Sequence, residues 1–191
     1  MDVRRGLGAG AAAVLVAAGT GATGAQAATG CPTGWGSGAR TAPAYAAGPM
    51  TGVRAGRHAC FDRLVVDVAA PAREGSAASA RGTYDVRYVP VVRTDGSGAR
   101  VPVRGAADLQ LVVRAPAYDP DTGRLVYRPA DRRELVATRR MRTLRQVAWA
   151  GSFEGQTTLA VGVRARLPFR VMVLQGPGPT SRVVVDVAHS W

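Results

Sequence analysis

His58, Cys60 and Asp62 are three closely spaced residues whose side chains can bind a metal ion. They alternate along the chain, so an extended strand would present all three on one face. A zinc site takes about four ligands, and the sequence offers no second cluster of such residues. The only other histidine, His189, is third from the end of the chain, where we expect a solvated side chain. We therefore expect no metal site and a structural role for Cys60.

The nucleophile motifs of hydrolases are missing. The chain has no lysine, which excludes a Ser-x-x-Lys site, and it has no Gly-x-Ser-x-Gly sequence. Ser152 lies near Glu154 without a histidine in sequence reach, which favours a turn between strands. Residues 119–123 resemble the start of a calcium loop, but its last acidic position is Ala130, so we expect a hairpin turn.

These observations predict a protein that is not an enzyme and needs no cofactor. The alternative is a hydrolase in which the fold brings Glu154 to within about 5–10 Å of a second acid, as glycoside cleavage requires.

Positive charge is concentrated in one short stretch of the chain. Its arginines are Arg132, Arg133, Arg139, Arg140, Arg142 and Arg145. Guanidinium groups bind phosphate and carboxylate well, and Trp149 or Tyr127 offers a face on which a sugar can stack. The stretch is either a binding site for an anionic polymer or a solvated basic face.

The first 27 residues have the three parts of a secretory signal peptide. Arg4 and Arg5 supply the positive charge, residues 6–18 form an uncharged apolar run, and Ala25-Gln26-Ala27 fits a cleavage site. The apolar run is shorter than the roughly 20 residues that span a bilayer, and no second run follows. We expect a secreted, extracellular protein, either free or attached to the cell wall, without a membrane span. The alternative is an alanine-rich N-terminus that is never cleaved.

The two cysteines, Cys31 and Cys60, are expected to form a disulfide, because exported proteins meet an oxidising environment. Closing a loop of this length stabilises a fold by roughly 3–4 kcal/mol in the chain-entropy model. A free catalytic thiol is the alternative, and the even count of cysteines disfavours it.

The protein is strongly basic, with a net charge of +12 carried entirely by arginine on the basic side. Lysine, asparagine and isoleucine are absent, so the arginine excess either serves a function or reflects a GC-rich coding sequence. The electric field of a strongly positive protein attracts anionic polymers. Export makes a cell-wall polymer a better partner than nucleic acid, which we do not expect to be bound.

Short β-rich runs separated by turns predict one antiparallel β-sandwich over residues 57–190. Residues 28–56 are rich in glycine and proline and are expected to form an irregular leader pinned by Cys31. The expected strands are 61–68, 83–93, 99–104, 109–115, 124–128, 157–163, 169–174 and 182–187. Residues 131–149 fit either a strand or a helix, and the β-branched residues favour a strand.

Residues 63–69 and 182–188 share the pattern Arg-x-Val-x-Asp-Val-Ala. Either both are simply buried strands in a valine-rich chain, or they are antiparallel neighbours with complementary charges. The second hypothesis pairs Arg63 with Asp186, Val65 with Val184 and Asp67 with Arg182.

Several short motifs occur in a characteristic order. They are His58-x-x-Phe61-Asp62-Arg63-Leu64-Val65, Tyr84-x-Val86-x-Tyr88, Gly105-Ala106-Ala107-Asp108-Leu109, Phe153-Glu154-Gly155, Pro168-Phe169-Arg170-Val171 and Arg182-Val183-Val184-Val185-Asp186-Val187. In this order they resemble the AMIN-like domain of secreted proteins from high-GC Gram-positive bacteria, over about residues 57–190. The resemblance implies a β-sandwich related to the AMIN domain, which targets envelope enzymes such as amidases to peptidoglycan. It implies no catalytic residues.

Together, the sequence predicts an exported, non-catalytic module that binds peptidoglycan or anionic cell-wall polymers through the basic stretch and Trp149. The alternative is a secreted module that binds a protein, as an inhibitor or accessory subunit of an exported enzyme. The sequence does not determine the oligomeric state.

Overall fold

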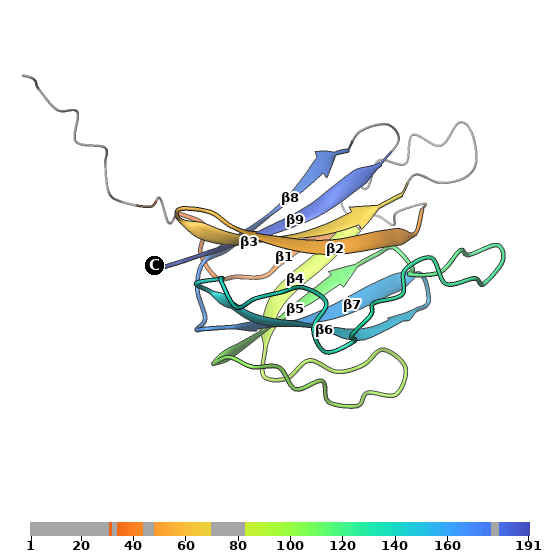
Figure 1. The fold of residues 1–191 in the computed structure, drawn as a ribbon, viewed down its shortest axis with the longest axis horizontal. Helices are drawn as coiled ribbons and strands as arrows, with labels where there is room; N and C mark the ends of the chain where they lie inside the picture. Colours follow the sequence, from red (N-terminus) through yellow and green to blue (C-terminus); the bar gives the residue numbers. More distant parts are fainter. Residues whose placement is uncertain (1–30, 32–33, 44–47, 70–82, 177–179) are drawn as a thin grey trace, which may run out of the picture. The chain divides into compact units, whose positions relative to one another are not determined.

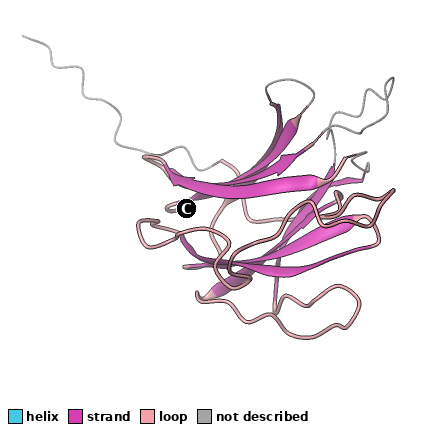
Figure 2. Cartoon of the chain, turned by 45° about the vertical axis from the view of Figure 1, so that its right-hand side comes forward, coloured by secondary structure: helices cyan, strands magenta, loops and turns pink. Residues whose placement is uncertain are grey.

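The computed structural model describes residues 31, 34–43, 48–69, 83–176 and 180–191. The predicted signal peptide, residues 1–27, lies outside these ranges. Throughout the described ranges the regular structure is all strand, as the magenta ribbons of Figure 2 show. This part of the chain accordingly contains no helix of the length and apolar character needed to cross a membrane.

The described residues form nine strands in two antiparallel sheets that face each other (Figure 1). The five-stranded sheet contains, in spatial order, β1 (Arg40–Pro43), β4 (Thr83–Val89), β5 (Ala107–Val113), β7 (Gln156–Val163) and β6 (Leu144–Phe153). The four-stranded sheet contains β2 (Met50–Arg57), β3 (Phe61–Val68), β9 (Ser181–Ala188) and β8 (Phe169–Gln175). The predicted all-β antiparallel sandwich is confirmed.

Alternation of apolar and polar residues in the strands builds the core between the sheets. In β3, Leu64, Val66 and Val68 are fully buried in this core, while Arg63 and Asp67 lie on the opposite, outer face. Burying one such aliphatic side chain stabilises the fold by roughly 1.5–3 kcal/mol.

Strands β3 and β9 pair in the register that their charge pattern predicts. Arg63 is opposite Asp186, Val65 is opposite Val184, and Asp67 is opposite Arg182. The first charge pair forms, with the Arg63 guanidinium donating to both Asp186 oxygens at 2.6 and 2.9 Å. Asp67 instead accepts two hydrogen bonds from Arg54 of β2. The register is therefore confirmed. The second predicted charge pair is replaced, because Asp67 pairs with Arg54 and not with Arg182.

The segment 28–56, expected to be irregular, contains β1 and most of β2, and that part of the prediction is wrong. Gly52 and Gly56 interrupt the apolar alternation of β2. The strand exists because its backbone pairs with β3 along its whole length. Such pairing is a tertiary interaction, which local propensity does not report.

Three other expected strands differ from the structure. Residues 99–104 and 124–128 each contribute only one isolated bridge, Arg93 with Arg100 and Tyr118 with Leu125. Residues 131–143 are loop, and the strand β6 starts at Leu144. The helical alternative for residues 131–149 is thus wrong, and the strand prediction holds for the second part.

Cys31 and Cys60 form the predicted disulfide, which fixes the N-terminal region to the start of β3. Trp35 packs edge-on against Phe61, with ring centroids 5.7 Å apart. The carbonyl oxygen of Gly36 also accepts a hydrogen bond from the backbone of Phe169 at 2.9 Å. The residues beyond the disulfide therefore pack on the four-stranded sheet.

The loop between β4 and β5, yellow-green in Figure 1, covers the outer face of the five-stranded sheet. Val101 and Val103 of this loop pack against Ala148 and Ala160, which are buried on that face. Gly162 lets the backbone of the loop lie directly against β7, because a Cβ atom at this position would be 1.9 Å from the carbonyl oxygen of Arg104. The loop is thereby held against β6 and β7.

Candidate functional site

A groove of about 530 Å³ lies between the β4–β5 loop, the segment 131–134 and strand β6. We call it the binding groove. Arg104, Arg132, Arg133, Gln146 and Trp149 are among the residues that line it. Three segments that are distant in sequence thus meet at the edge strand of the five-stranded sheet.

Gln146 connects the two walls of the binding groove. Its side chain is buried; its Oε1 accepts a hydrogen bond from the backbone N–H of Arg104 at 2.7 Å, and its Nε2 donates to the carbonyl of Arg133 at 2.9 Å. The backbone N–H of Trp149 donates to the carbonyl of Arg132 at 2.7 Å. These bonds hold segment 131–134 along the otherwise free edge of β6.

The groove arginines differ in their electrostatic state. Arg104 forms an ion pair with Glu134, and this hydrogen bond raises the pKa of the Arg104 guanidinium. The side chains of Arg132 and Arg133 are exposed and make no hydrogen bond or ion pair with any residue that the structure describes. The guanidinium groups of Arg132 and Arg133 are therefore available to an anionic ligand, as is that of the exposed Arg100 on the facing loop.

Trp149 lies where the binding groove meets a second hollow of about 400 Å³, which we call the hairpin hollow. The Trp149 ring is tilted against the Tyr127 ring, with centroids 5.9 Å apart. Arg132 and Trp149 line both hollows, and the hairpin hollow continues over Leu125 and Phe153, each 51 % exposed. An elongated ligand can therefore contact guanidinium groups and aromatic rings in succession.

Asp95 brings a carboxyl group to the hairpin hollow. Its Oδ2 is buried and has no hydrogen-bond partner among the described residues. Burial raises the pKa of the Asp95 carboxyl, because desolvation disfavours its charged form.

The sequence matches the AMIN-like domain over residues 48–189, which is most of the chain and all of the sandwich from β2 onward. The protein belongs to the AMIN-like domain family. Such domains are generally non-catalytic binding modules. No curated protein and no solved structure shows significant similarity to the chain.

The AMIN-like domain does not gather all the predicted binding residues into one place. Arg132, Arg133 and Trp149 meet in the binding groove. Arg142 lines a different hollow. Arg145 donates from its side chain to the carbonyl of Met141 at 3.3 Å.

The other two predicted arginines, Arg139 and Arg140, are exposed in a turn closed by a hydrogen bond from Met141 to Thr138. They line neither the binding groove nor the hollow at Arg142. The arginines of the basic stretch are therefore distributed over several parts of the surface.

The histidine expected at a solvated chain end is largely covered instead, which corrects that prediction. The His189 side chain is 9 % exposed, and its Nε2 lies 3.0 Å from Oδ1 of Asp62. The other Asp62 oxygen accepts from the backbone N–H groups of Thr143 and Leu144 at 2.5 and 3.1 Å. Nothing in the local sequence pattern indicates this pair, because its members are 127 residues apart.

Asp62 is thus engaged in structural bonds, and Cys60 is in a disulfide. The His58 ring stacks on Phe61 at a centroid distance of 4.5 Å. In the part of the chain that the structure describes, no three histidine, cysteine, aspartate or glutamate side chains are grouped as metal ligands.

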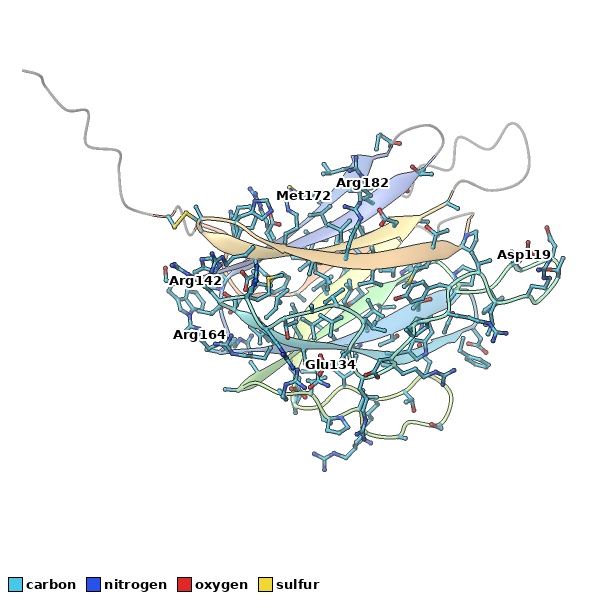
Figure 3. All side chains as sticks on the ribbon, viewed as in Figure 1. Asp119, Glu134, Arg142, Arg164, Met172 and Arg182 are labelled. Carbon is cyan, nitrogen blue, oxygen red and sulfur yellow. A yellow bond between two sulfur atoms is a disulfide. The ribbon has the colours of Figure 1, made fainter. Side chains whose placement is uncertain are left out.

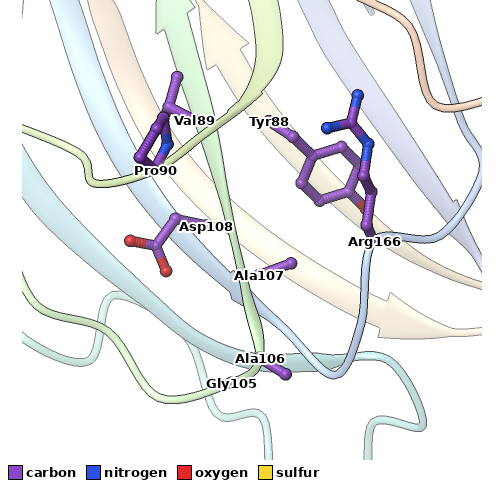
Figure 4. A pocket seen from close by; sticks show the side chains of 8 residues that line it. All are labelled: Tyr88, Val89, Pro90, Gly105, Ala106, Ala107, Asp108 and Arg166. Carbon is purple, nitrogen blue, oxygen red and sulfur yellow. The ribbon is translucent and has the colours of Figure 1, made fainter.

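A further pocket lies beside β5 and contains Tyr88, Asp108 and Arg166 (Figure 4). The Tyr88 hydroxyl donates to the carbonyl of Leu167 at 2.9 Å and accepts from its N–H at 3.0 Å. Figure 4 shows the Asp108 carboxyl pointing away from the Tyr88 ring and the Arg166 guanidinium. Burial raises the pKa of the Asp108 carboxyl. The polar groups of this pocket do not converge on a common point.

Proposed function

We propose that this AMIN-like domain is an exported, non-catalytic module that binds peptidoglycan or an anionic cell-wall polymer in the binding groove. The observation that carries the proposal is that Arg132 and Arg133, which make no hydrogen bond or ion pair with a described residue, line the same groove as Trp149. Guanidinium groups bind carboxylate and phosphate, and aromatic rings offer an apolar face to sugars. The family membership and the net charge of +12 support the same partner class.

Co-sedimentation of the purified protein with isolated cell walls tests the proposal. We expect binding at low ionic strength and release by salt, because the screening length falls from about 10 Å at 0.1 M to about 3 Å at 1 M. Failure to bind at low ionic strength would contradict the proposal.

Paired variants locate the site. Arg132→Ala with Arg133→Ala should weaken wall binding, whereas Arg139→Ala with Arg140→Ala removes the same charge outside the groove and should weaken it less. Equal loss in both double variants would mean that the net charge, and not the groove, holds the polymer.

Export is part of the proposal and has its own test. Expression in a host with a secretory pathway should place the protein in the medium or wall fraction. Mass spectrometry should show that it begins close to residue 28. An intact N-terminus on a protein that stays inside the cell would contradict export.

A second candidate function is binding of an exported protein, which the exposed Leu125 and Phe153 favour. Exposed apolar residues that share one hollow are typical of protein contacts. Pull-down from culture supernatant with wild-type protein and with Phe153→Ser distinguishes this function. A partner retained by the wild type alone, with no wall binding, would favour it over the polymer.

A further inference from the structure

A third hollow, of about 270 Å³, lies at the turn between β2 and β3, and we call it the corner hollow. Arg57, His58 and Ala59 form one wall, and Arg142 forms the other. It shares no lining residue with the binding groove or the hairpin hollow. Figure 3 shows Arg142 at the end of the sandwich where the yellow disulfide bond lies.

The wall that carries His58 is rigid. The backbone N–H of His58 donates to the carbonyl of Phe61 at 2.9 Å, which closes the turn. The His58 ring stacks on the Phe61 ring, and the disulfide at Cys60 holds the turn from the other side. The side chains at the tip of the turn therefore project from a fixed backbone.

Asp62 fixes the second wall relative to the first. It follows Phe61 directly, and its Oδ2 accepts hydrogen bonds from Thr143 and Leu144, the two residues that follow Arg142. The carboxylate is fully buried and also bonded to His189. The spacing between the backbones at Arg57 and Arg142 is thus set by the fold.

The charges of the corner hollow are not neutralised within the described part of the chain. The Arg57 and Arg142 side chains are exposed and make no hydrogen bond or ion pair there. Asp62 stands opposite Arg57 in the β2–β3 register, but its oxygens are occupied by the bonds to Thr143, Leu144 and His189. The hollow is therefore lined by two arginines and a histidine and by no acidic residue.

We propose that the corner hollow binds a phosphate group of a polymer or small phosphate ester. Arginine presents paired N–H donors that match two oxygens of a tetrahedral phosphate, and such charge-assisted bonds are short and strong. The volume accommodates a phosphate with several waters, since one water occupies about 30 Å³. Apart from Ala59 the lining is polar, which suits a hydrated phosphate ester better than the apolar surface of a bilayer. The proposal is independent of the binding groove and of the wall-binding function.

Titration of the purified protein with inorganic phosphate and with glycerol 3-phosphate, followed by amide NMR, tests the assignment. We expect saturable shifts confined to residues 57–59 and 142–144. Arg57→Ala and Arg142→Ala should each weaken binding about tenfold, as expected for the loss of charge-assisted hydrogen bonds.

Arg139→Ala is the matched control, because it removes one exposed arginine from the same loop without touching the hollow. Its phosphate affinity should stay within about twofold of wild type, and thermal unfolding should show that all variants are folded. Equal weakening in the control, or unchanged affinity in both hollow variants, would overturn the proposal.

Two further ligands test the chemical class. Acetate should bind much more weakly than phosphate; equal affinity would replace the phosphate site by a general anion patch. Binding to phosphatidylglycerol vesicles without binding to glycerol 3-phosphate would overturn the assignment in favour of a membrane surface. Because the readout is phosphate binding at residues 57–59 and 142–144, its outcome is separate from wall binding by the groove.

Discussion

The Nε2 atom of His189 lies 3.0 Å from Oδ1 of Asp62, and this contact joins the end of the chain to the start of β3. The other ring nitrogen, Nδ1, lies 3.2 Å from the carbonyl oxygen of Ala59. Together with the two backbone bonds to Asp62, the pair connects β3, the start of β6 and the residues after β9.

Asp62→Ala should destabilise the fold more than His189→Ala. The first change leaves two buried backbone N–H groups without their charged acceptor, and each such bond contributes about 1.5–3 kcal/mol. Urea unfolding should therefore show a loss of roughly 3 kcal/mol or more for Asp62→Ala and about half of that for His189→Ala. A larger loss for the histidine variant would mean that its packing matters more than the Asp62 carboxylate.

Two acidic residues on the outer face of the four-stranded sheet should respond very differently to mutation. Asp186 is fully buried and paired with Arg63 and Arg170, whereas Asp67 is 30 % exposed and paired with Arg54. Asp186→Ala should cost roughly 1.5–3 kcal/mol, because it removes the shared acceptor of two charged arginine side chains. Asp67→Ala should cost less than about 1 kcal/mol. Chemical denaturation of both variants checks the contrast, and similar losses would refute it.

Asp95 should make the protein less stable as pH rises. Burial raises the pKa of its carboxyl in the folded state, so the folded protein binds more protons than the unfolded chain above pH of about 4. Asp95→Asn should therefore raise Tm at pH 7, and the gain should shrink as pH falls toward 4. Thermal unfolding between pH 4 and 8 measures this.

Asp119→Asn is the control, because it should change Tm at pH 7 in the opposite direction. Hydrogen bonds from the backbone N–H groups of Thr122 and Asp121 lower the pKa of the Asp119 carboxyl. This carboxylate therefore adds stability above its unfolded pKa of about 3.9 and loses it as pH falls. The variant should lower Tm at pH 7 and have little effect at the acidic end. Shifts of the same sign in both variants would contradict this account.

Gln146→Ala should impair wall binding although Gln146 carries no charge. The change removes the acceptor of the Arg104 N–H and the donor to the Arg133 carbonyl. We expect a stability loss of about 1–3 kcal/mol and weaker co-sedimentation with cell walls at a temperature where the variant is fully folded. Unchanged sedimentation would mean that the groove walls need no fixed spacing.

The sequence predicts those parts of the fold whose determinants are local. The β3–β9 register follows from the charges of Arg63 and Asp186 in strands that each show clear alternation. The strand β2 escapes prediction because its glycines weaken the local pattern, and pairing with β3 supplies the missing stability. The disulfide is predicted because the expected export and the even count of two cysteines both favour it.

The candidate site is only partly predictable for a similar reason. Arg132 and Trp149 are recognisable as groups that can bind an anionic sugar polymer. Their groove depends on Gln146, whose two hydrogen bonds reach two segments that lie 42 and 13 residues earlier in the chain. Arg57 and His58 are also missed as partners of Arg142, because the Asp62 contact that brings them together spans 81 residues.

The disulfide has a mechanical consequence for a protein that is pulled or sheared. Force applied through the N-terminal residues reaches the described fold at Cys31 and passes across the sulfur atoms to Cys60. The short strand β1 and the strand β2 lie inside this covalent loop and carry none of the load while the bond is intact. The load enters directly beside β3, which has neighbours on both sides. Oxidation thus moves the point where the force enters from β1, an edge strand of the five-stranded sheet, to β3, an interior strand of the four-stranded sheet.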